Sequence, residues 1–205
     1  MSNHQQYIIT GIGTEVGKTV VSAIIAEALS AKYWKPIQAG DLDQSDSIKI
    51  ENYTEQVTIL TEAFRLNHAM SPHAAAEKDG VTISKSDLEL PKVEGNLIVE
   101  GAGGLMVPIN SNGLLFIDLF SMWKLPVILV SRHYLGSINH TLMSVEILQK
   151  RNIEIAGIVF IGHENKDTEK VILSVSKCKM ITRIPLTSSV DKAFVLEQAK
   201  AFTIT

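Results

Sequence analysis

The sequence predicts an α/β fold: a single doubly wound domain over residues 1–205, with a mainly parallel sheet and helices on both of its faces. Short apolar runs without polar alternation are typical of parallel strands that are buried on both faces. The longer stretches between these runs place apolar residues three and four positions apart, which indicates amphipathic helices. The chain has 205 residues, of which 45% are hydrophobic, so it can bury a sizeable core.

The expected strands and helices alternate along the chain. Strands are expected at residues 7–10, 33–38, 96–100, 125–131 and 156–161, and a less apolar strand at 179–185. Three helices are expected, one of them at about 190–202. The other two are predicted from apolar residues that fall on one helix face. The first face consists of Val20, Val21, Ile24, Ile25, Ala28 and Leu29, and the second of Ile138, Thr141, Leu142, Val145 and Leu148. Residues 40–95 are expected to combine polar loops with a helix around 54–64.

Charge and composition argue against several classes of partner. The net charge of -3 provides no basic field for nucleic acid or an anionic membrane. No apolar run reaches the ~18 residues that a transmembrane helix needs, and the first residues do not have the pattern of a secretory signal. The single cysteine, Cys178, cannot form an internal disulfide and fits a reducing cytoplasm, which is the expected location.

The stretch "GIGTEVGKT", residues 11–19, ends as a phosphate-binding loop does. The usual motif is a Gly, any four residues and then Gly-Lys-Ser/Thr. In this sequence the first Gly of the motif would fall on Ile12, but the glycines are at the positions directly before and after it, Gly11 and Gly13. An apolar run precedes the loop and an amphipathic helix follows it, so a helix N-terminus can bind phosphate. Lys18 is predicted to reach the β- and γ-phosphates, and Thr19 to bind Mg²⁺. A glycine-rich turn with a solvated lysine is the alternative.

Other charged residues are candidates for the same site. Glu100 ends an apolar run and enters a glycine-rich turn, which places it at the carboxyl edge of a parallel sheet, where ligands bind. Lys35 lies in an expected strand before Pro36, either aimed at an anion or solvated at a sheet edge. Spacing does not select a metal ligand among the acids of "GDLDQSD", which are Asp41, Asp43 and Asp46.

Three segments together, "GTEVGKT", "YWKPIQAG" and "EGAGGLMVPI", resemble the dethiobiotin synthetase family, and so do "SPHAAA" and residues 136–160. The resemblance implies a P-loop NTPase-like fold and a ligase that uses ATP and Mg²⁺ to join CO₂ to 7,8-diaminononanoate. In that reaction one amine forms a carbamate, and the carbamate takes the γ-phosphoryl group of ATP. The second amine then closes the ureido ring of dethiobiotin, and phosphate leaves.

The resemblance also implies roles for individual residues. Lys18 and Lys35 become catalytic lysines, which favours the anion-directed interpretation of Lys35, and Thr19, Asp46 and Glu100 become metal ligands. The implied nucleotide-binding positions are Glu15, Val16, Gly17, Lys18, Thr19, Val20, Asp46, Glu100, Gly101, Ala102, Gly103, Ile161, Gly162, Pro185, Leu186 and Thr187. The implied diamine-binding positions are Thr14 and Ala39 and, from the neighbouring subunit of a homodimer, Gly136, Ser137 and Asn139.

Three positions depart from the family pattern. Gly13 stands where the family often has Asp, and Ala39 stands where a small hydroxyl residue commonly contacts the substrate. Ile161 replaces an Asn that reads adenine. Because an apolar side chain cannot hydrogen-bond to a base, weaker discrimination among nucleoside triphosphates is expected.

Other classes of protein share this arrangement of sheet and loop. Partitioning-type ATPases, which bind protein partners, usually carry a second lysine early in the loop, and residues 11–17 contain none. The amidation domains of cobalamin-type synthetases depend on an attached glutaminase domain, for which 205 residues leave no room. A binding module without catalysis is disfavoured because Lys18, Thr19, Lys35 and Glu100 are all present.

Overall fold

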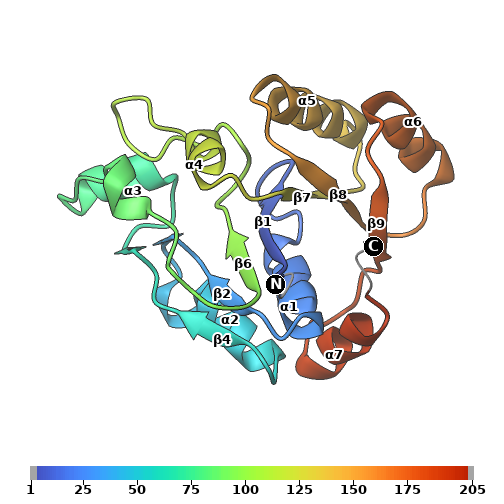
Figure 1. Ribbon diagram of the computed structural model, residues 1–205, viewed down its shortest axis with the longest axis horizontal. Helices are drawn as coiled ribbons and strands as arrows, with labels where there is room; N and C mark the ends of the chain where they lie inside the picture. The colour runs from blue at the N-terminus through green and yellow to red at the C-terminus, as the bar shows by residue number, and fades with distance from the viewer. Residues whose placement is uncertain (1–3, 203–205) are drawn as a thin grey trace.

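Seven strands form a parallel central sheet in the order β4-β2-β6-β1-β7-β8-β9 (Figure 1). The computed structural model describes residues 4–202. The strands of this sheet are β1 (Gln6–Gly11), β2 (Lys32–Trp34), β4 (Thr58–Leu60), β6 (Leu97–Glu100), β7 (Val127–Arg132), β8 (Ile155–Ile161) and β9 (Met180–Ile184). From β1 the chain passes to β2 and β4, returns to β6 beside β1, and then moves outward through β7, β8 and β9, so the sheet is doubly wound.

Helices cover both faces of the sheet, as Figure 1 shows. One face carries α1 (Lys18–Ala28), α2 (Asp46–Tyr53) and α7 (Lys192–Lys200), and the other carries α4 (Phe116–Trp123), α5 (Ser137–Lys150) and α6 (Lys166–Ser176). Shorter helical segments are η1 (Leu42–Gln44), α3 (Pro72–Lys78) and η2 (Lys85–Leu88). The predicted fold class is therefore confirmed. Within the described part of the chain, no helix has the length and apolar character needed to cross a membrane.

Two separate cores explain why the strand sequences are apolar without alternation. Ile8 packs with α4, whereas its neighbour Ile9 packs with α1, and both are fully buried. Val99 and Ile98 of β6 divide between the same two cores in the same way. Each strand in the middle of the sheet therefore needs apolar side chains on both faces.

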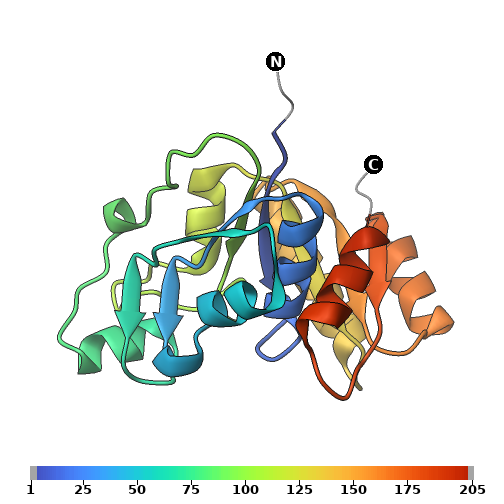
Figure 2. The ribbon, with the colours of Figure 1, turned by 90° about the horizontal axis from the view of Figure 1, so that it is seen from below.

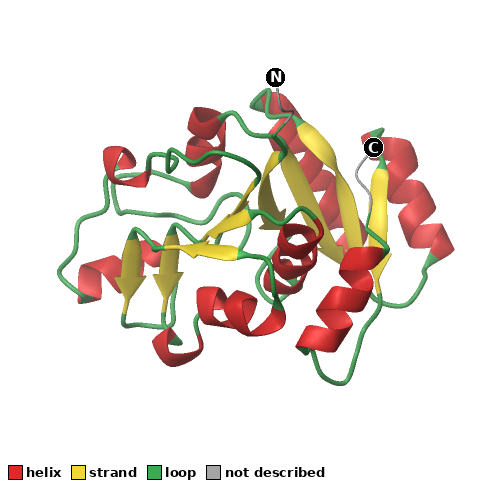
Figure 3. Ribbon diagram, turned by 60° about the horizontal axis from the view of Figure 1, so that its bottom comes forward, coloured by secondary structure: helices red, strands yellow, loops and turns green. Residues whose placement is uncertain are grey.

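The predicted strand at residues 33–38 is divided into two in the structure. β2 ends at Trp34, and residues 37–39 form β3 (Ile37–Ala39), which pairs with β5 (Phe64–Leu66) in a separate two-stranded sheet (Figure 3). Pro36 lies at the break; it has no N–H to donate to a neighbouring strand, and its carbonyl accepts the Phe64 N–H at 3.1 Å. Lys35 is thereby placed just beyond the carboxyl end of β2.

The predicted helix around residues 54–64 is wrong. The helix in this region is α2, which begins after Ser45, whose side chain accepts the Ile48 N–H at 3.3 Å. Thr54 is extended, with φ −121° and ψ 168°, and it ends the helix. Ile59 and Leu60 of β4 then face opposite cores, as strand residues do. The other predicted strands agree with the structure to within about two residues at each end.

Candidate functional site

The carboxyl ends of β1, β6 and β2 lie side by side in the sheet. Ile9 of β1 is opposite Glu100 of β6, and Val99 of β6 is opposite Trp34 of β2. The loop after β1 lies at the edge toward which these strands run (Figure 2). This register brings residues 12–17, Lys35 and Glu100 to one edge of the sheet, although they are far apart along the chain.

The glycines of the phosphate-binding loop fit it closely to the chain around it. A Cβ atom at Gly11 would overlap the side chain of Val16. Gly17 precedes the first turn of α1 with a φ of 93°, and a Cβ there would lie 2.6 Å from Cδ1 of Ile161. The free N–H groups of the first turn and the helix dipole make this end of α1 a site for phosphate.

Lys18 is folded back over the loop. Its Nζ donates to the Gly13 carbonyl at 3.0 Å, and the side chain is 8% exposed. Burial lowers the pKa of Lys18, and the negative charge of Glu100 only partly opposes this effect. A partly desolvated ammonium at the phosphate-binding loop favours an anionic ligand, because the ligand replaces the lost hydration.

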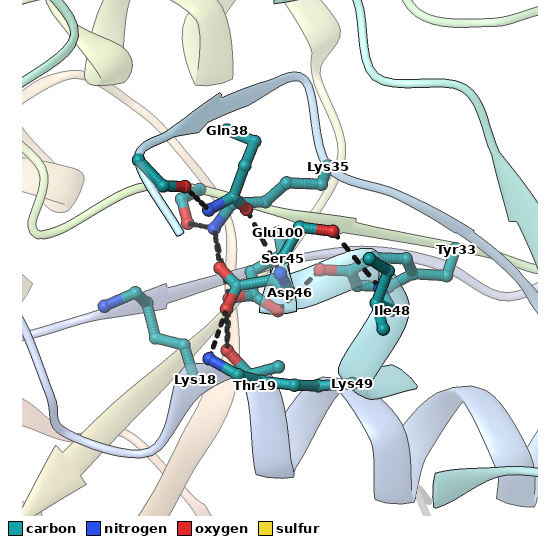
Figure 4. Close-up of polar contacts among 12 residues, drawn as sticks. Lys18, Thr19, Tyr33, Lys35, Gln38, Ser45, Asp46, Ile48, Lys49 and Glu100 are labelled. Carbon is teal, nitrogen blue, oxygen red and sulfur yellow. Dashed lines mark hydrogen bonds and ion pairs between the residues drawn. The ribbon is translucent and has the colours of Figure 1, made fainter. Parts of the chain in front are cut away.

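Three oxygen atoms from distant segments converge beside the loop (Figure 4). The Thr19 hydroxyl lies 3.1 Å from Oδ1 of Asp46 and 3.0 Å from Oε1 of Glu100. Hydroxyl and carboxylate oxygens are ligands that suit Mg²⁺, which binds to one or two carboxylates together with substrate phosphates. The structure thus brings the three predicted metal ligands together. Among residues 4–202 no group of three or more His, Cys, Asp or Glu side chains could hold a metal ion.

The Lys35 ammonium lies between the carboxylates of Asp46 and Glu100. Its Nζ is 2.6 Å from Oδ2 of Asp46, 3.2 Å from Oε1 of Glu100 and 3.1 Å from the Gly101 carbonyl (Figure 4). The side chain is 4% exposed, and burial by itself would lower its pKa; Glu100 and Asp46 outweigh burial and raise it. Lys35 is therefore a protonated, buried cation at the carboxyl edge, and it is not solvated at a sheet edge.

Asp46 is the only acid of the 41–46 run that reaches this group; Asp41 and Asp43 are exposed. Burial would raise the pKa of Asp46, but Lys35 outweighs it and holds the carboxyl below its usual range. Gln38 fixes the backbone at Asp46, because its Oε1 accepts the Asp46 N–H at 3.1 Å and its Nε2 donates to the Gly40 carbonyl at 2.8 Å. The sequence did not predict this contact between Gln38 and Asp46.

Tyr33 is a second member of the site that sequence reasoning missed. Its hydroxyl donates to Oε2 of Glu100 at 2.9 Å (Figure 4). Burial, followed by the charge of Glu100, raises the pKa of Tyr33 well above its usual value, so the hydroxyl keeps its proton. A tyrosine inside an apolar strand gives no sequence signal of such a contact.

Comparison with known proteins identifies the family. A family model described as "AAA domain" matches residues 5–193. A relative from Christiangramia forsetii, named ATP-dependent dethiobiotin synthetase BioD, is 52% identical over 97% of this chain and 96% of its own length. A relative of the same name from Rhodopseudomonas palustris is 46% identical over 90% of this chain and 89% of its own length. Another from Brucella ovis is 44% identical over 89% of this chain and 87% of its own length.

The chain belongs to the ATP-dependent dethiobiotin synthetase family.

Solved structures with low sequence identity share the fold of this family member. A ParA family ATPase from Chlorobium tepidum has a TM-score of 0.56 at 11% identity, with 97% of this chain and 90% of the other covered. The cell division ATPase MinD from Pyrococcus furiosus has a TM-score of 0.54 at 14% identity, covering 95% and 88%. At these identities the likeness supports the P-loop fold alone.

The positions that the family resemblance assigned to the base lie at the ends of β8 and β9. Ile161 ends β8, and the Gly162 N–H donates to the Ile184 carbonyl at 3.1 Å, directly before residues 185–187. The Ile161 side chain is 6% exposed and lies against Gly17, so it supports the phosphate-binding loop. Val16 is also buried, at 3% exposure, so its side chain packs inside the protein.

The positions assigned to the diamine fall into two groups. Thr14 lies close to Gly103, since a Cβ at Gly103 would be 3.6 Å from its hydroxyl oxygen, and Ala39 ends β3 beside Gln38. Ser137 and Asn139 are on the first turn of α5, after Gly136 with a φ of 103°. Among residues 4–202, no hydrogen bond or ion pair links Ser137 or Asn139 to Lys35 or Asp46. Within the described chain, the first turn of α5 is therefore not joined to Lys35 or Asp46 by a direct polar contact.

Proposed function

We propose that this chain catalyses the ATP-dependent formation of dethiobiotin from 7,8-diaminononanoate and CO₂, a ligase reaction of biotin biosynthesis that releases ADP and phosphate. Relatives of the same family name, 44–52% identical over most of the chain, support this activity. The observation that carries it at the site is the placement of Lys35. A second buried cation beside the loop lysine suits a reaction in which two anionic groups, a carbamate and a γ-phosphate, must meet.

The proposed reaction proceeds in three steps. One amine of the substrate adds to CO₂ and loses a proton, giving a carbamate. A carbamate oxygen displaces ADP from the γ-phosphorus atom, giving a mixed anhydride. The second amine attacks its carbonyl carbon and loses a proton, and phosphate leaves as the ureido ring closes. Lys18 and Lys35 hold the anionic oxygens together and stabilise the charge that shifts during phosphoryl transfer.

Thr19, Asp46 and Glu100 would hold Mg²⁺ with the nucleotide. The ion supplies charge neutralisation at the phosphates. Lys35 contributes a fixed positive charge, because the two carboxylates keep it protonated at neutral pH. It therefore acts on the anions electrostatically and is not the base that removes protons from the amines.

We further propose a homodimer in which α5 of one subunit serves the site of the other. The first turn of α5 presents the N–H groups of Ile138 and Asn139, which suit the carboxylate of the substrate. Apolar side chains stand exposed nearby, with Leu135 104%, Met143 52% and Met106 51% exposed. The last two also line a hollow of about 250 Å³ between α5 and residues 104–107. A second copy of the chain would cover this apolar face.

A cytoplasmic location fits the free thiol of Cys178.

The decisive experiment supplies purified protein with diaminononanoate, bicarbonate and Mg-ATP, and follows phosphate and dethiobiotin together. Dethiobiotin formed in equal amount to phosphate is the expected result. Phosphate release that needs no diamine and does not respond to it would support a partitioning-type ATPase and contradict the proposal.

The same assay with CTP and GTP tests base selection: because Ile161 offers no hydrogen bond, kcat/KM for the three nucleotides should agree within about 10-fold.

A further inference from the structure

The Tyr33 side chain is buried among apolar residues, but its hydroxyl group is directed toward the candidate site. It has no exposed surface, and its ring packs in the core that includes Ile9, Ile98 and Ile24. Phenylalanine would fill this space with no polar atom to satisfy, whereas the tyrosine hydroxyl needs a partner inside the protein. Its partner is Oε2 of Glu100, at 2.9 Å (Figure 4).

The two oxygens of Glu100 have different partners. Oε1 accepts the Thr19 hydroxyl at 3.0 Å and the Lys35 ammonium at 3.2 Å, and Oε2 accepts the Tyr33 hydroxyl. The last side-chain torsion of a glutamate is broad and roughly two-fold, so the carboxylate plane is poorly fixed by its own chain. Donors on both oxygens fix the plane from two sides, and the donor on Oε2 comes from the strand next to β6.

We propose that Tyr33 is a positioning residue for Glu100: its hydroxyl fixes the carboxylate plane so that Oε1 is the oxygen turned toward Thr19 and the metal–nucleotide complex. The proposal rests on the proposed function only in that Glu100 serves a Mg²⁺-bound nucleotide. Tyr33 touches no reacting atom, because Glu100 lies between it and the loop. Groups that orient a metal ligand in this way typically change metal affinity or activity about 10- to 100-fold when they are removed.

The Tyr33→Phe variant removes one oxygen atom and leaves the ring in the core. Glu100, which is 1% exposed, then loses the donor on Oε2, and its carboxylate plane is held through Oε1 alone. We expect the effect to appear in the part of nucleotide binding that depends on the metal. Phosphate binding by the loop residues requires neither Tyr33 nor the orientation of Glu100.

The test measures the dissociation constant of ADP by titration calorimetry, once with Mg²⁺ and once with EDTA, for the wild type, Tyr33→Phe and Tyr7→Phe. Tyr7, on β1, is a matched control because it packs against the same core and lies away from Glu100. In Tyr33→Phe we expect the Mg²⁺-dependent gain in ADP affinity to fall about 10-fold, while affinity in EDTA stays within about 2-fold. Tyr7→Phe should behave as the wild type does.

Two results would overturn the proposal. The first is an unchanged Mg²⁺-dependent gain in Tyr33→Phe; the second is an equal loss of affinity with Mg²⁺ and with EDTA, which is what a general disturbance of the fold produces. In a Glu100→Gln background, Tyr33→Phe should reduce the gain no further, because both changes act on the same carboxylate. ADP binding does not involve the diamine, so failure to form dethiobiotin would reject the proposed function and leave this measurement intact.

Discussion

Lys35 is a cation surrounded by the carboxylates that are also expected to hold the metal. Its Nζ contacts Asp46 and Glu100, and Lys49 is a second lysine near Asp46, at 3.8 Å. The two lysines differ in exposure: Lys35 is 4% exposed and Lys49 40%. Because a charge acts most strongly where water is excluded, Lys35 should dominate the electrostatics at this edge of the sheet.

Replacing Lys35 by Gln should therefore lower kcat for dethiobiotin formation by about 100- to 1000-fold, since it removes a charge that acts on phosphoryl transfer. Lys49→Gln is the matched control and should keep kcat within about 3-fold, because exposed ion pairs contribute little. Steady-state kinetics with circular dichroism on both variants checks this. A folded Lys35→Gln variant with near-normal kcat would remove Lys35 from its catalytic role.

Residues of the loop motif and the acid at a strand end could be predicted from the sequence, whereas neutral residues within strands could not. The loop motif predicted Lys18 and Thr19, and the strand-ending position predicted Glu100. Gln38 and Tyr33 lie in strands, where a neutral side chain gives no signal of its partner. Their contacts depend on the register of β2 with β6 and on the return of the chain through residues 40–45, which no local pattern encodes.

At the scale of elements, α6 is joined to the sheet by a buried carboxylate. Glu169 of α6 accepts from Arg183 of β9 at 2.8 and 2.6 Å, and its Oε1 lies 2.9 Å from Nε2 of His133. Chiefly through the Arg183 hydrogen bonds, and against the effect of burial, the pKa of Glu169 falls to about 2. This cluster lies beneath the strand ends that were assigned to the base.

The Glu169 cluster should make the stability of the protein depend on acid pH. Its carboxyl has a lower pKa in the folded chain than in the unfolded chain, so its contribution is complete above the unfolded value of about 4.5 and disappears as pH falls toward 2. Arg183→Leu should lower the free energy of unfolding by about 2 kcal/mol at pH 7, and less at pH 3. Urea unfolding at both values checks this.

Glu164→Gln is the control for the Arg183 variant, because Glu164 contacts the same guanidinium at 3.3 Å from an exposed position. It should change the free energy of unfolding by less than about 0.5 kcal/mol at either pH. An Arg183→Leu effect of equal size at pH 7 and pH 3 would mean that the arginine stabilises the protein by packing, and the ionic explanation would then be wrong.

The elements that periodicity predicted best are those buried on one clear face or in the sheet centre. Between residues 40 and 95 the predicted helix was misplaced, and the elements there are short, since β4 has only three residues and α2 only eight. Segments this short hold too few residues for a period to be distinguished. Pro36 divided an apolar run that was predicted as one strand, and α2 begins after Ser45, whose side chain caps the helix.

At the scale of the whole molecule, sheet order determines which segments meet. β1 lies between β6 and β7, so the loop after β1 is next to Glu100 on one side and next to the β7–α5 connection on the other. The first side holds Lys35 and the residues that we propose as metal ligands. The second leads to the first turn of α5 and to the exposed side chains of Leu135 and Met143, the proposed contact between two copies.

This arrangement predicts that two inactive variants can restore activity to each other. Lys35→Gln damages the site of its own chain, while Asn139→Glu, on the exposed first turn of α5, should repel the substrate carboxylate held by the partner chain. When both are expressed together, a mixed dimer has one site with both defects and one with neither. Random pairing makes about half of the dimers mixed, so about one quarter of wild-type kcat should return. Activity no greater than the sum of the separate variants, in a preparation shown by native mass spectrometry to contain mixed dimers, would mean that each chain builds its site alone.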